Sequence, residues 1–371
     1  MAGRPIAATA GRSRAGIEAD GAVEQLAKAV ADGDRRALAR AITLIESTRL
    51  DHRERADSLI ARLLPLSGRS IRIGISGVPG VGKSSLIETI GLHAIARGYK
   101  VAVLTVDPSS KRSGGSILGD KTRMDELARN ERSFIRPSPA GGALGGVARR
   151  TREAMLACES AGFEAVIVET VGVGQAETAV ADMVDMFVLL VQPGGGDELQ
   201  GLKRGIMELA DMVVVTKADG ELEAAANRAA ADYRMALSLL RPVTPNWTAP
   251  VLQCSAHTGR GIGELWDEVE RYRRVLGASG DIGERRALQA RAWLWRELSE
   301  SLLDELSADP RLKAKLGVLE AMVAGGKVTP GAAARSLLAA FLGREPATAD
   351  RPRRGARTAT PRRRVTGPAR P

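Results

Sequence analysis

The central part of the chain alternates short, continuous apolar segments with longer segments of helical periodicity. Apolar runs of about four to six residues are too short to cross a bilayer, which needs about 20, and are typical of buried parallel strands. The segments predicted as strands are 71–76, 101–106, 133–136, 165–169, 186–191, 212–216 and 251–254. Strands that alternate with helices in this way favour a mostly parallel, doubly wound α/β sheet.

Both flanks of this central part show helical spacing. On the N-terminal side, Asp34 and Asp51 stand where they are expected to cap successive helices. Beyond Gly263, Trp293 and several leucines recur at three- and four-residue steps, and Trp295 adds a second tryptophan. Apolar surface on such an arm suits either a core or a dimer contact. The buried positions expected in the N-terminal helices are Leu26, Val30, Leu38, Ile42, Ile45, Leu59 and Leu63.

The first predicted strand leads into a match to the phosphate-binding pattern GxxxxGK[ST]. A strand before the loop and a helix after it are what this pattern requires, because the loop N–H groups and the positive helix end face the phosphates. We expect Lys83 to neutralise β/γ-phosphate charge and the Ser84 hydroxyl to bind Mg²⁺. A glycine-rich turn without a ligand is the alternative. The residues expected to contact the nucleotide are Gly77, Val78, Pro79, Gly80, Val81, Gly82, Lys83, Ser84 and Ser85.

A second motif concerns the base of the nucleotide. The sequence TKAD at 216–219 follows a strand and resembles the guanine-specificity motif [NT]KxD, with Thr216 in place of the commoner Asn. The Asp219 carboxylate can accept hydrogen bonds from guanine N1–H and its exocyclic amine, and the Lys217 stem can cover the base. Ser255 and Ala256 follow the last strand and resemble the loop that contacts guanine O6. The combination favours GTP and GDP over adenine nucleotides.

Three acidic residues are candidates for the metal site and the switch regions. Asp107 and Asp120 flank a polar, glycine-rich segment suited to close over the γ-phosphate. Glu169 ends a strand where many GTPases have DxxG, with the Gly172 N–H as a γ-phosphate sensor. No glutamine of the Ras type is identifiable, so we expect slow intrinsic hydrolysis. We assign catalysis to Lys83, Asp107, Asp120 and Glu169, and Mg²⁺ to Ser84, Asp107, Asp120 and Glu169.

The charge distribution and the cysteine content of the chain do not predict a specific nucleic-acid partner or a disulfide scaffold. The net charge is +10, but eight arginines and no acid lie in 351–371, so 10 − 8 leaves +2 for the rest. We expect that tail to be disordered, with weak RNA or acidic-protein contact left open and no specific nucleic-acid partner. The basic N-terminus superficially resembles a transit peptide, but without a secretory apolar segment. Two cysteines, Cys158 and Cys254, imply no disulfide scaffold and fit the cytoplasm; we expect both to be inert, buried thiols.

Together these patterns predict a P-loop NTPase with helical additions on both sides. The predicted parts are a disordered N-terminus (1–20), an N-terminal helical extension (21–66), a G domain (67–275), a C-terminal helical dimerisation region (276–345) and a disordered Arg/Pro-rich tail (346–371).

Five segments in this order resemble the MeaB/ArgK-type G3E GTPases. They are VDPSS at 106–110, SGGSILGDKTRM at 113–124, ETVGVGQAE at 169–177, QPGGGDELQGLKRGIMELAD at 192–211 and TKAD at 216–219. The resemblance implies a homodimeric G-protein chaperone of an adenosylcobalamin-dependent acyl-CoA mutase, chiefly methylmalonyl-CoA mutase. Such a GTPase gates cofactor delivery and protects or reactivates the mutase. The resemblance also implies an additional switch loop at 194–203, with Lys203 as its charged latch; a static surface loop is the alternative.

Three other functions compete with this interpretation. The older ArgK-type label, a kinase of amino-acid transport proteins, is disfavoured by TKAD and by the lack of a kinase-type base loop. A nickel-type metal-insertion GTPase would need soft or imidazole ligands, and the three histidines and two cysteines do not cluster in the sequence. A non-enzymatic GTP-binding adaptor would differ in GTP turnover, measured with and without mutase.

Overall fold

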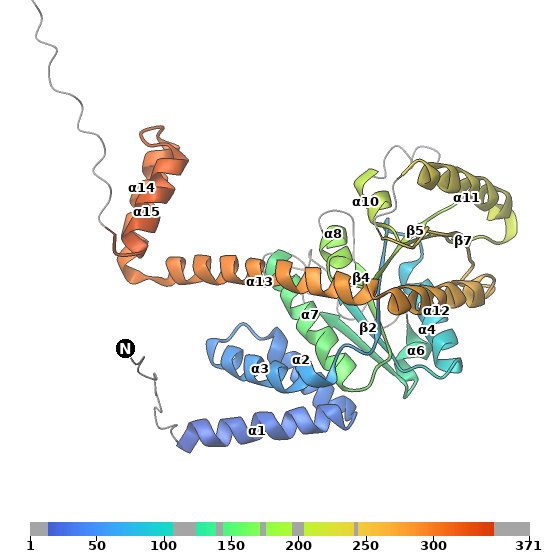
Figure 1. The fold of residues 1–371 in the computed structure, drawn as a ribbon, viewed down its shortest axis with the longest axis horizontal. Coiled ribbons are helices and arrows are strands. Elements are labelled where there is room, and N and C mark those ends of the chain that lie inside the picture. The colour runs from blue at the N-terminus through green and yellow to red at the C-terminus, as the bar shows by residue number, and fades with distance from the viewer. Residues whose placement is uncertain are drawn as a thin grey trace, which may run out of the picture. The chain divides into compact units, whose positions relative to one another are not determined.

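The computed structural model describes residues 14–106, 124–138, 144–170, 176–194, 204–240 and 244–344 (Figure 1). This part of the chain falls into two compact units, one ending at Trp293 and the other beginning at Leu294. Of the predicted disordered ends, residues 1–13 and 346–371 lie outside the described residues, whereas residues 14–20 are helical and not disordered as predicted. The five predicted domain boundaries stay predictions.

The described residues of the first unit form a seven-stranded sheet in which every pair of neighbours is parallel. The strand order is β3-β2-β4-β1-β5-β6-β7. The predicted doubly wound sheet is thereby confirmed, and each predicted strand ends within about two residues of the observed one. The strands are β1 (Ile71–Gly77), β2 (Val101–Val106), β3 (Ser133–Ser138), β4 (Ala165–Thr170), β5 (Met186–Val191), β6 (Met212–Val215) and β7 (Val251–Gln253).

Helices cover both faces of this sheet, which is why its strands are apolar without interruption. In β2, Ala102 and Leu104 face one core cluster with α7, whereas Val101 and Val103 face the other with α4 and α12. Alternate residues of a strand point to opposite faces, so a strand buried on both sides needs apolar residues at every position. These helices are α4 (Lys83–Ala96), α6 (Asp125–Arg129), α7 (Leu144–Ser160), α8 (Ala176–Ala181), α10 (Arg204–Leu209), α11 (Glu223–Ser238) and α12 (Ile262–Ser279).

Three N-terminal helices, α1 (Arg14–Ala31), α2 (Arg35–Glu46) and α3 (Leu50–Leu63), pack on the α7 side of the sheet. Of the buried positions expected there, only Leu26 is no more than partly buried. Asp34 caps α2 as predicted, since its carboxylate accepts hydrogen bonds from the N–H groups of Arg36 and Ala37. The prediction for Asp51 is wrong. Helix α3 already begins at Leu50, and the Asp51 carboxylate binds the guanidinium of Arg49 instead.

The described chain from 262 to 344 is helical apart from short connections, as the sequence pattern predicts. Helix α13 (Asp281–Ala308) runs from the first unit into the second, which also contains α14 (Pro310–Ala324) and α15 (Pro330–Phe341). Asp309 and Thr329 cap α14 and α15. None of the described helices combines the length and the apolar character needed to cross a membrane. Cys158 and Cys254 are buried and free, and burial raises the pKa of Cys254 to about 12, which keeps its thiol neutral.

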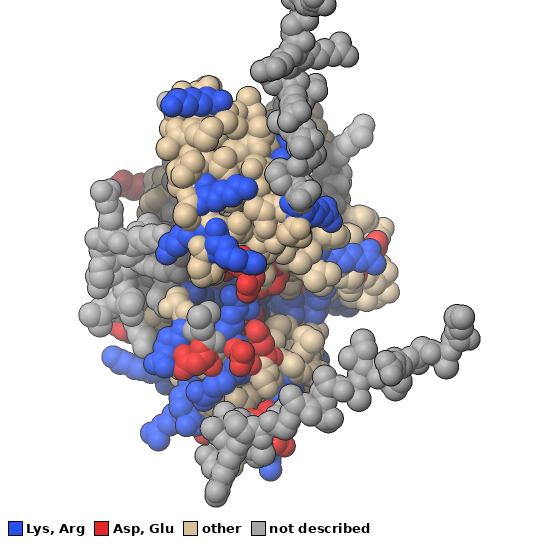
Figure 2. All heavy atoms as spheres, turned by 90° about the vertical axis from the view of Figure 1, so that its left-hand side faces the viewer, with Lys and Arg blue, Asp and Glu red and all other residues tan. Residues whose placement is uncertain are grey.

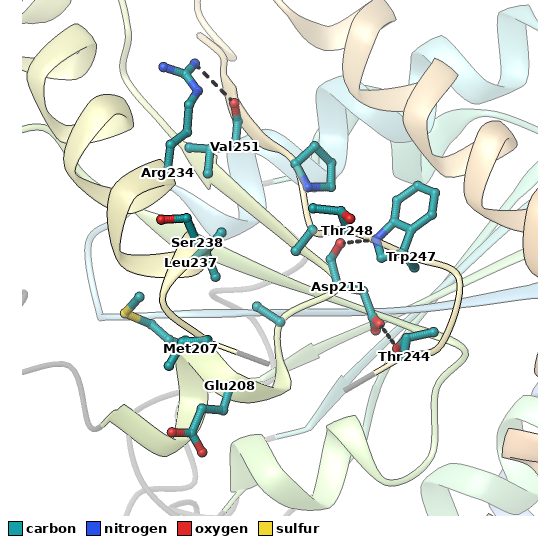
Figure 3. Close-up of a pocket in the computed structure, with 14 residues that line it drawn as sticks. Met207, Glu208, Asp211, Arg234, Leu237, Ser238, Thr244, Trp247, Thr248 and Val251 are labelled. Atoms are coloured by element: carbon teal, nitrogen blue, oxygen red, sulfur yellow. Dashed lines mark hydrogen bonds between the residues drawn. The ribbon is translucent and has the colours of Figure 1, made fainter. Parts of the chain in front are cut away.

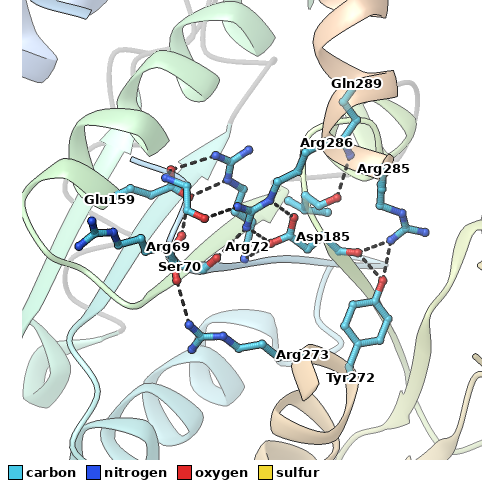
Figure 4. Close-up of polar contacts among 12 residues, drawn as sticks. Arg69, Ser70, Arg72, Glu159, Asp185, Tyr272, Arg273, Arg285, Arg286 and Gln289 are labelled. Atoms are coloured by element: carbon cyan, nitrogen blue, oxygen red, sulfur yellow. Dashed lines mark hydrogen bonds and ion pairs between the residues drawn. The ribbon is translucent and has the colours of Figure 1, made fainter. Parts of the chain in front are cut away.

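The start of α13 is anchored to the amino ends of β5 and β6 by two arginines, and Figure 4 shows the contacts at Asp185, just before β5. Arg286 donates from Nε and Nη2 to the two Asp185 oxygens at 2.7 and 2.6 Å. Arg285 donates to Asp211 Oδ2 at 2.9 Å. Asp185 is fully buried and also accepts the backbone N–H of Arg72 at 2.8 Å. Because each buried charge has a partner, the helix begins at a defined place on the sheet.

Removing one member of this buried pair should lower stability strongly. Asp185→Ala leaves the Arg286 guanidinium and a backbone N–H without their acceptor, so we expect a loss of about 3–5 kcal/mol in the free energy of unfolding. Urea titration followed by circular dichroism measures it. Asp267→Ala is the matched control, because it removes a carboxylate that is 60% exposed and pairs with Arg97 at the surface. Equal losses in both variants would contradict the anchoring role.

Candidate functional site

The predicted nucleotide-binding segments meet at the carboxyl edge of the sheet. The phosphate-binding segment follows β1, the central strand, and Glu169 lies near the end of neighbouring β4. TKAD follows β6, and Ser255 follows β7. Because all strands are parallel, these four ends share one edge, which is where open α/β sheets bind their ligands.

The phosphate-binding loop has a backbone that needs glycine. Gly80 and Gly82 have φ angles of 81° and 100°, a left-handed conformation that a side chain disfavours. Gly82 is the N-cap of α4 and no side chain caps this helix, which leaves first-turn N–H groups for an anion. Lys83 Nζ donates to the carbonyl oxygens of Gly77 at 2.7 Å and Val78 at 3.2 Å. The ammonium is therefore held against the loop that it is predicted to serve.

Two buried acids, Glu169 and Glu177, lie near Lys83 of the phosphate-binding loop. The Ser84 hydroxyl donates to Glu169 Oε1 at 3.0 Å, and Glu169 is only 3% exposed. Burial lowers the pKa of Lys83, whereas the negative charges of Glu169 and Glu177 act in the opposite direction. Glu177 is buried as well and lies 3.4 Å from the hydroxyl of Ser76. Glu177 was not among the site residues predicted from the sequence. The only feature that could have pointed to it is its place at the end of the ETVGVGQAE segment, 169–177.

Two side-chain oxygens of the kind that hard cations prefer, from Ser84 and Glu169, come together from separate elements. A hydroxyl and a carboxylate oxygen 3.0 Å apart match the ligand preference of Mg²⁺. The other residues assigned to this region, Asp107, Asp120, Gly172 and Lys203, lie outside the described residues. Within the described ranges, which include every histidine and cysteine of the chain, no group of three or more His, Cys, Asp or Glu side chains is placed to hold a metal.

Two hydrogen bonds fasten TKAD to the phosphate-binding loop. Thr216 Oγ1 donates to the Val81 carbonyl at 2.7 Å, and Lys217 Nζ donates to the Gly80 carbonyl at 2.8 Å. Lys217 has a φ of 55°, which is uncommon for a residue other than glycine. Lys217 has this backbone conformation while its ammonium group contacts the Gly80 carbonyl. The Thr216 hydroxyl thus makes a bond to the loop from the position where Asn is commoner. Asp219 is partly exposed and makes no side-chain hydrogen bond within the described chain.

The segment after β7 is tied to the same edge. The Ala218 N–H donates to the carbonyl of Cys254 at 3.0 Å, which sets TKAD beside Ser255. Ser255 is 1% exposed, and its hydroxyl accepts the N–H of Thr258. On the other side, Thr89 Oγ1 of α4 lies 3.4 Å from the Ala256 carbonyl. The phosphate, TKAD and 255–256 segments therefore form one connected site.

A family model described as "Methylmalonyl Co-A mutase-associated GTPase MeaB" matches residues 38–311, more than half of the chain. The chain belongs to the MeaB family. The family assignment confirms the resemblance seen in the sequence, and with it guanine nucleotide binding and GTP hydrolysis as general properties. It leaves the roles of individual residues as proposals.

Similar proteins agree with this assignment over most of the chain. A Caulobacter vibrioides protein named as a GTPase is 56% identical over 319 residues, covering 86% of this chain and 98% of its own. The mouse protein named "Methylmalonic aciduria type A homolog, mitochondrial" is 46% identical over 332 residues, covering 87% and 80%. A crystal structure titled LAO/AO transport system kinase has a TM-score of 0.69 at 36% identity, covering 87% of this chain and 98% of its own.

A hollow of about 450 Å³ lies away from the family's nucleotide motifs, at the amino ends of β6 and β7 (Figure 3). Several polar groups in its wall bind one another. Trp247 Nε1 donates to the Asp211 carbonyl at 2.7 Å, Thr244 Oγ1 to Asp211 Oδ1 at 2.6 Å, and Arg234 Nη2 to the Val251 carbonyl at 3.3 Å. We therefore assign this hollow no part in nucleotide binding.

Proposed function

We propose that this protein is a cytoplasmic GTPase that serves as the G-protein chaperone of an adenosylcobalamin-dependent acyl-CoA mutase, methylmalonyl-CoA mutase above all. Hydrolysis of GTP would gate cofactor delivery and protect or reactivate the mutase. Membership of the MeaB family supports the partner, and so does the name of the mouse relative. The observation that best supports GTP as the nucleotide is the pair of hydrogen bonds from Thr216 and Lys217 to the phosphate-binding loop, because they tie the segment that contains Asp219 to that loop.

Each predicted residue has a physical role in this proposal. The loop N–H groups and Lys83 hold the phosphates of GTP or GDP. Asp219 recognises the guanine edge, with the backbone of Ser255 and Ala256 near O6. Ser84 and Glu169, with Asp107 and Asp120, would hold Mg²⁺, which neutralises phosphate charge when bound. Gly172 and Lys203 would respond to the γ-phosphate and to the partner.

GTP turnover with and without the mutase tests this function. The mutase is expected to accelerate hydrolysis, because a bound partner can order switch segments that the free GTPase holds poorly. Lys203→Ala should lose most of the stimulated increment and keep basal turnover near that of the unchanged protein. Phosphate transfer to a transport protein would favour the kinase alternative. No stimulation by any cobalamin-dependent mutase would contradict the chaperone role.

We also propose that the chain forms a homodimer through its C-terminal helices. Apolar side chains on these helices are exposed, as Trp295 at 68% and Leu303 at 63% show. Exposed apolar surface on this scale is typical of a protein contact. Trp293, in contrast, is partly buried and lies under the Arg152 guanidinium, 4.2 Å from its ring centre. The further exposed leucine and valine positions in the described part of 276–345 are Leu288, Leu294, Leu298, Leu302, Val318, Leu338 and Leu342.

Placing charge on this apolar surface should break the dimer. Trp295→Glu combined with Leu303→Glu is expected to weaken self-association by at least about 100-fold, since buried aromatic anchors contribute about 2 kcal/mol or more each. Sedimentation velocity over a concentration series measures it. Lys313→Glu adds the same carboxylate at an exposed polar position of α14 and should stay dimeric. A monomeric unchanged protein would exclude the homodimer.

A further inference from the structure

A second hollow, of about 870 Å³, opens among the N-terminal helices, and none of its lining residues belongs to the predicted nucleotide site. We call it the cationic hollow. Residues of α1, α2, the segment after α2, the start of α3 and β3 line it. They are Ala22, Gln25, Leu26, Ala29, Arg40, Thr43, Leu44, Glu46, Ser47, His52, Arg55 and Arg136.

The charges in this lining do not balance. Among the described residues that form it, three arginines face one glutamate, which leaves 3 − 1 = +2 with the histidine neutral. Glu46 is already engaged, because Arg136 Nη2 donates to its Oε2 at 2.5 Å and the Glu46 side chain is only 5% exposed. Arg40 and Arg55 are exposed and form no ion pair or side-chain hydrogen bond with other described residues. Asp34, at the start of α2, is the one described acid with a Coulombic interaction with Arg40, and it lies outside the lining of the hollow. The two rim guanidinium groups therefore keep their hydrogen-bond donors available to an occupant.

The interior of the hollow combines donors with apolar surface. Arg136 Nε is buried and has no hydrogen-bond acceptor among the described residues. Leu26, Ala29 and Leu44 supply apolar contacts to the wall. An occupant that complements this lining carries carboxylates for the two arginines at the rim and an apolar side chain between them.

We infer that the cationic hollow docks an acidic segment of the partner mutase, an inference that rests on the proposed function. Nucleic acid fits less well, because residues 20–66 hold eight basic and eight acidic side chains, a balance that a continuous phosphate backbone does not match. Figure 2 shows basic and acidic side chains interspersed over the lower part of that view, where the N-terminal helices lie. A short segment can reach the arginines between these acids.

The position of the hollow connects such a partner with the nucleotide-binding edge. Arg136 lies two residues before the end of β3, and Ser138 at that end pairs with Val106 at the end of β2. These strand ends belong to the same carboxyl edge as the phosphate-binding loop. A segment held by Arg136, Arg40 and Arg55 would thus dock beside the edge that carries the nucleotide chemistry.

Charge reversal at the rim tests the inference. The full chain with Arg40→Glu and Arg55→Glu is immobilised, and its affinity for methylmalonyl-CoA mutase is measured by biolayer interferometry with a non-hydrolysable GTP analogue. We expect affinity to fall about 10- to 100-fold, with basal GTP turnover and melting temperature unchanged. Arg36→Glu with Arg228→Glu reverses two exposed arginines outside the hollow and should bind normally. If the double reversal does not fold, Arg40→Gln with Arg55→Gln replaces it, with a smaller loss of the same sign.

The outcomes separate this inference from the proposed function. If the unchanged protein binds the mutase and both double variants bind equally well, the docking site is wrong and the chaperone function stands. If the unchanged protein does not bind any cobalamin-dependent mutase, both the docking site and the chaperone function are contradicted. A photoreactive p-benzoyl-phenylalanine in place of Gln25 should crosslink to a mutase peptide rich in Asp and Glu. A crosslink to a peptide without acids, or to nucleic acid only, would overturn the inference.

Discussion

Asp219→Asn is expected to weaken GTP binding by about 100-fold or more, and to raise the relative affinity for xanthosine triphosphate. The carboxylate would accept two hydrogen bonds from guanine, each worth about 1.5–3 kcal/mol because the acceptor is charged, and about 1.4 kcal/mol is tenfold in affinity. An amide presents a donor at one of these places, which suits the carbonyl that xanthine carries there. Titration with fluorescent nucleotide analogues measures both affinities.

Because the TKAD segment is held to the phosphate-binding loop, the Asp219 variant tests base recognition separately from the integrity of the loop. Thr216 and Lys217 hold it to the phosphate-binding loop through main-chain carbonyl groups, so changing the next acid alters recognition without releasing the loop. Glu221→Gln removes an exposed acid two residues farther on and should leave GTP affinity unchanged. Equal affinity of the unchanged protein for ATP and GTP would show that Asp219 does not read the base.

Lys83→Ala is expected to abolish tight triphosphate binding, whereas Glu169→Ala should retain nucleotide and lose Mg²⁺-dependent hydrolysis. The lysine compensates phosphate charge directly, and losing a charge-assisted contact of about 3 kcal/mol lowers affinity on the order of 100-fold. The Glu169 carboxylate lies against the Ser84 hydroxyl, so its loss disturbs the metal ligands rather than the phosphate-binding loop, and should cost about 10- to 100-fold in turnover.

Measuring both binding and turnover distinguishes the two roles. Isothermal titration with a GTP analogue reports affinity, and phosphate release over a Mg²⁺ series reports hydrolysis. Lys100→Ala, at an exposed lysine outside the site, should behave like the unchanged protein in both assays. Normal hydrolysis in both Lys83→Ala and Glu169→Ala would place the catalytic site elsewhere.

Local patterns were sufficient wherever one physical requirement acts on consecutive residues. Strands such as β5 are buried on both faces and therefore read as unbroken apolar runs, and the phosphate-binding loop needs glycines at fixed spacing for its left-handed angles. Where the same side chain could either cap a helix or form an ion pair, the local pattern did not decide between the two. Asp is a residue type that commonly caps helices, but α3 begins at Leu50, one residue before Asp51. The Asp51 carboxylate instead forms an ion pair with Arg49.

By itself, the sequence determined the class of fold, the P-loop and the family, because each depends on patterns among residues close together in the chain, whereas guanine recognition by TKAD stays a prediction. The tertiary structure alone decided which distant residues meet. It set Glu177 near Lys83, joined Thr216 to Val81, paired Arg286 with Asp185, and brought Arg40 and Arg136 to one hollow. These contacts join residues separated by tens to hundreds of positions, and their spacing follows from strand order and helix packing, which a linear pattern does not encode.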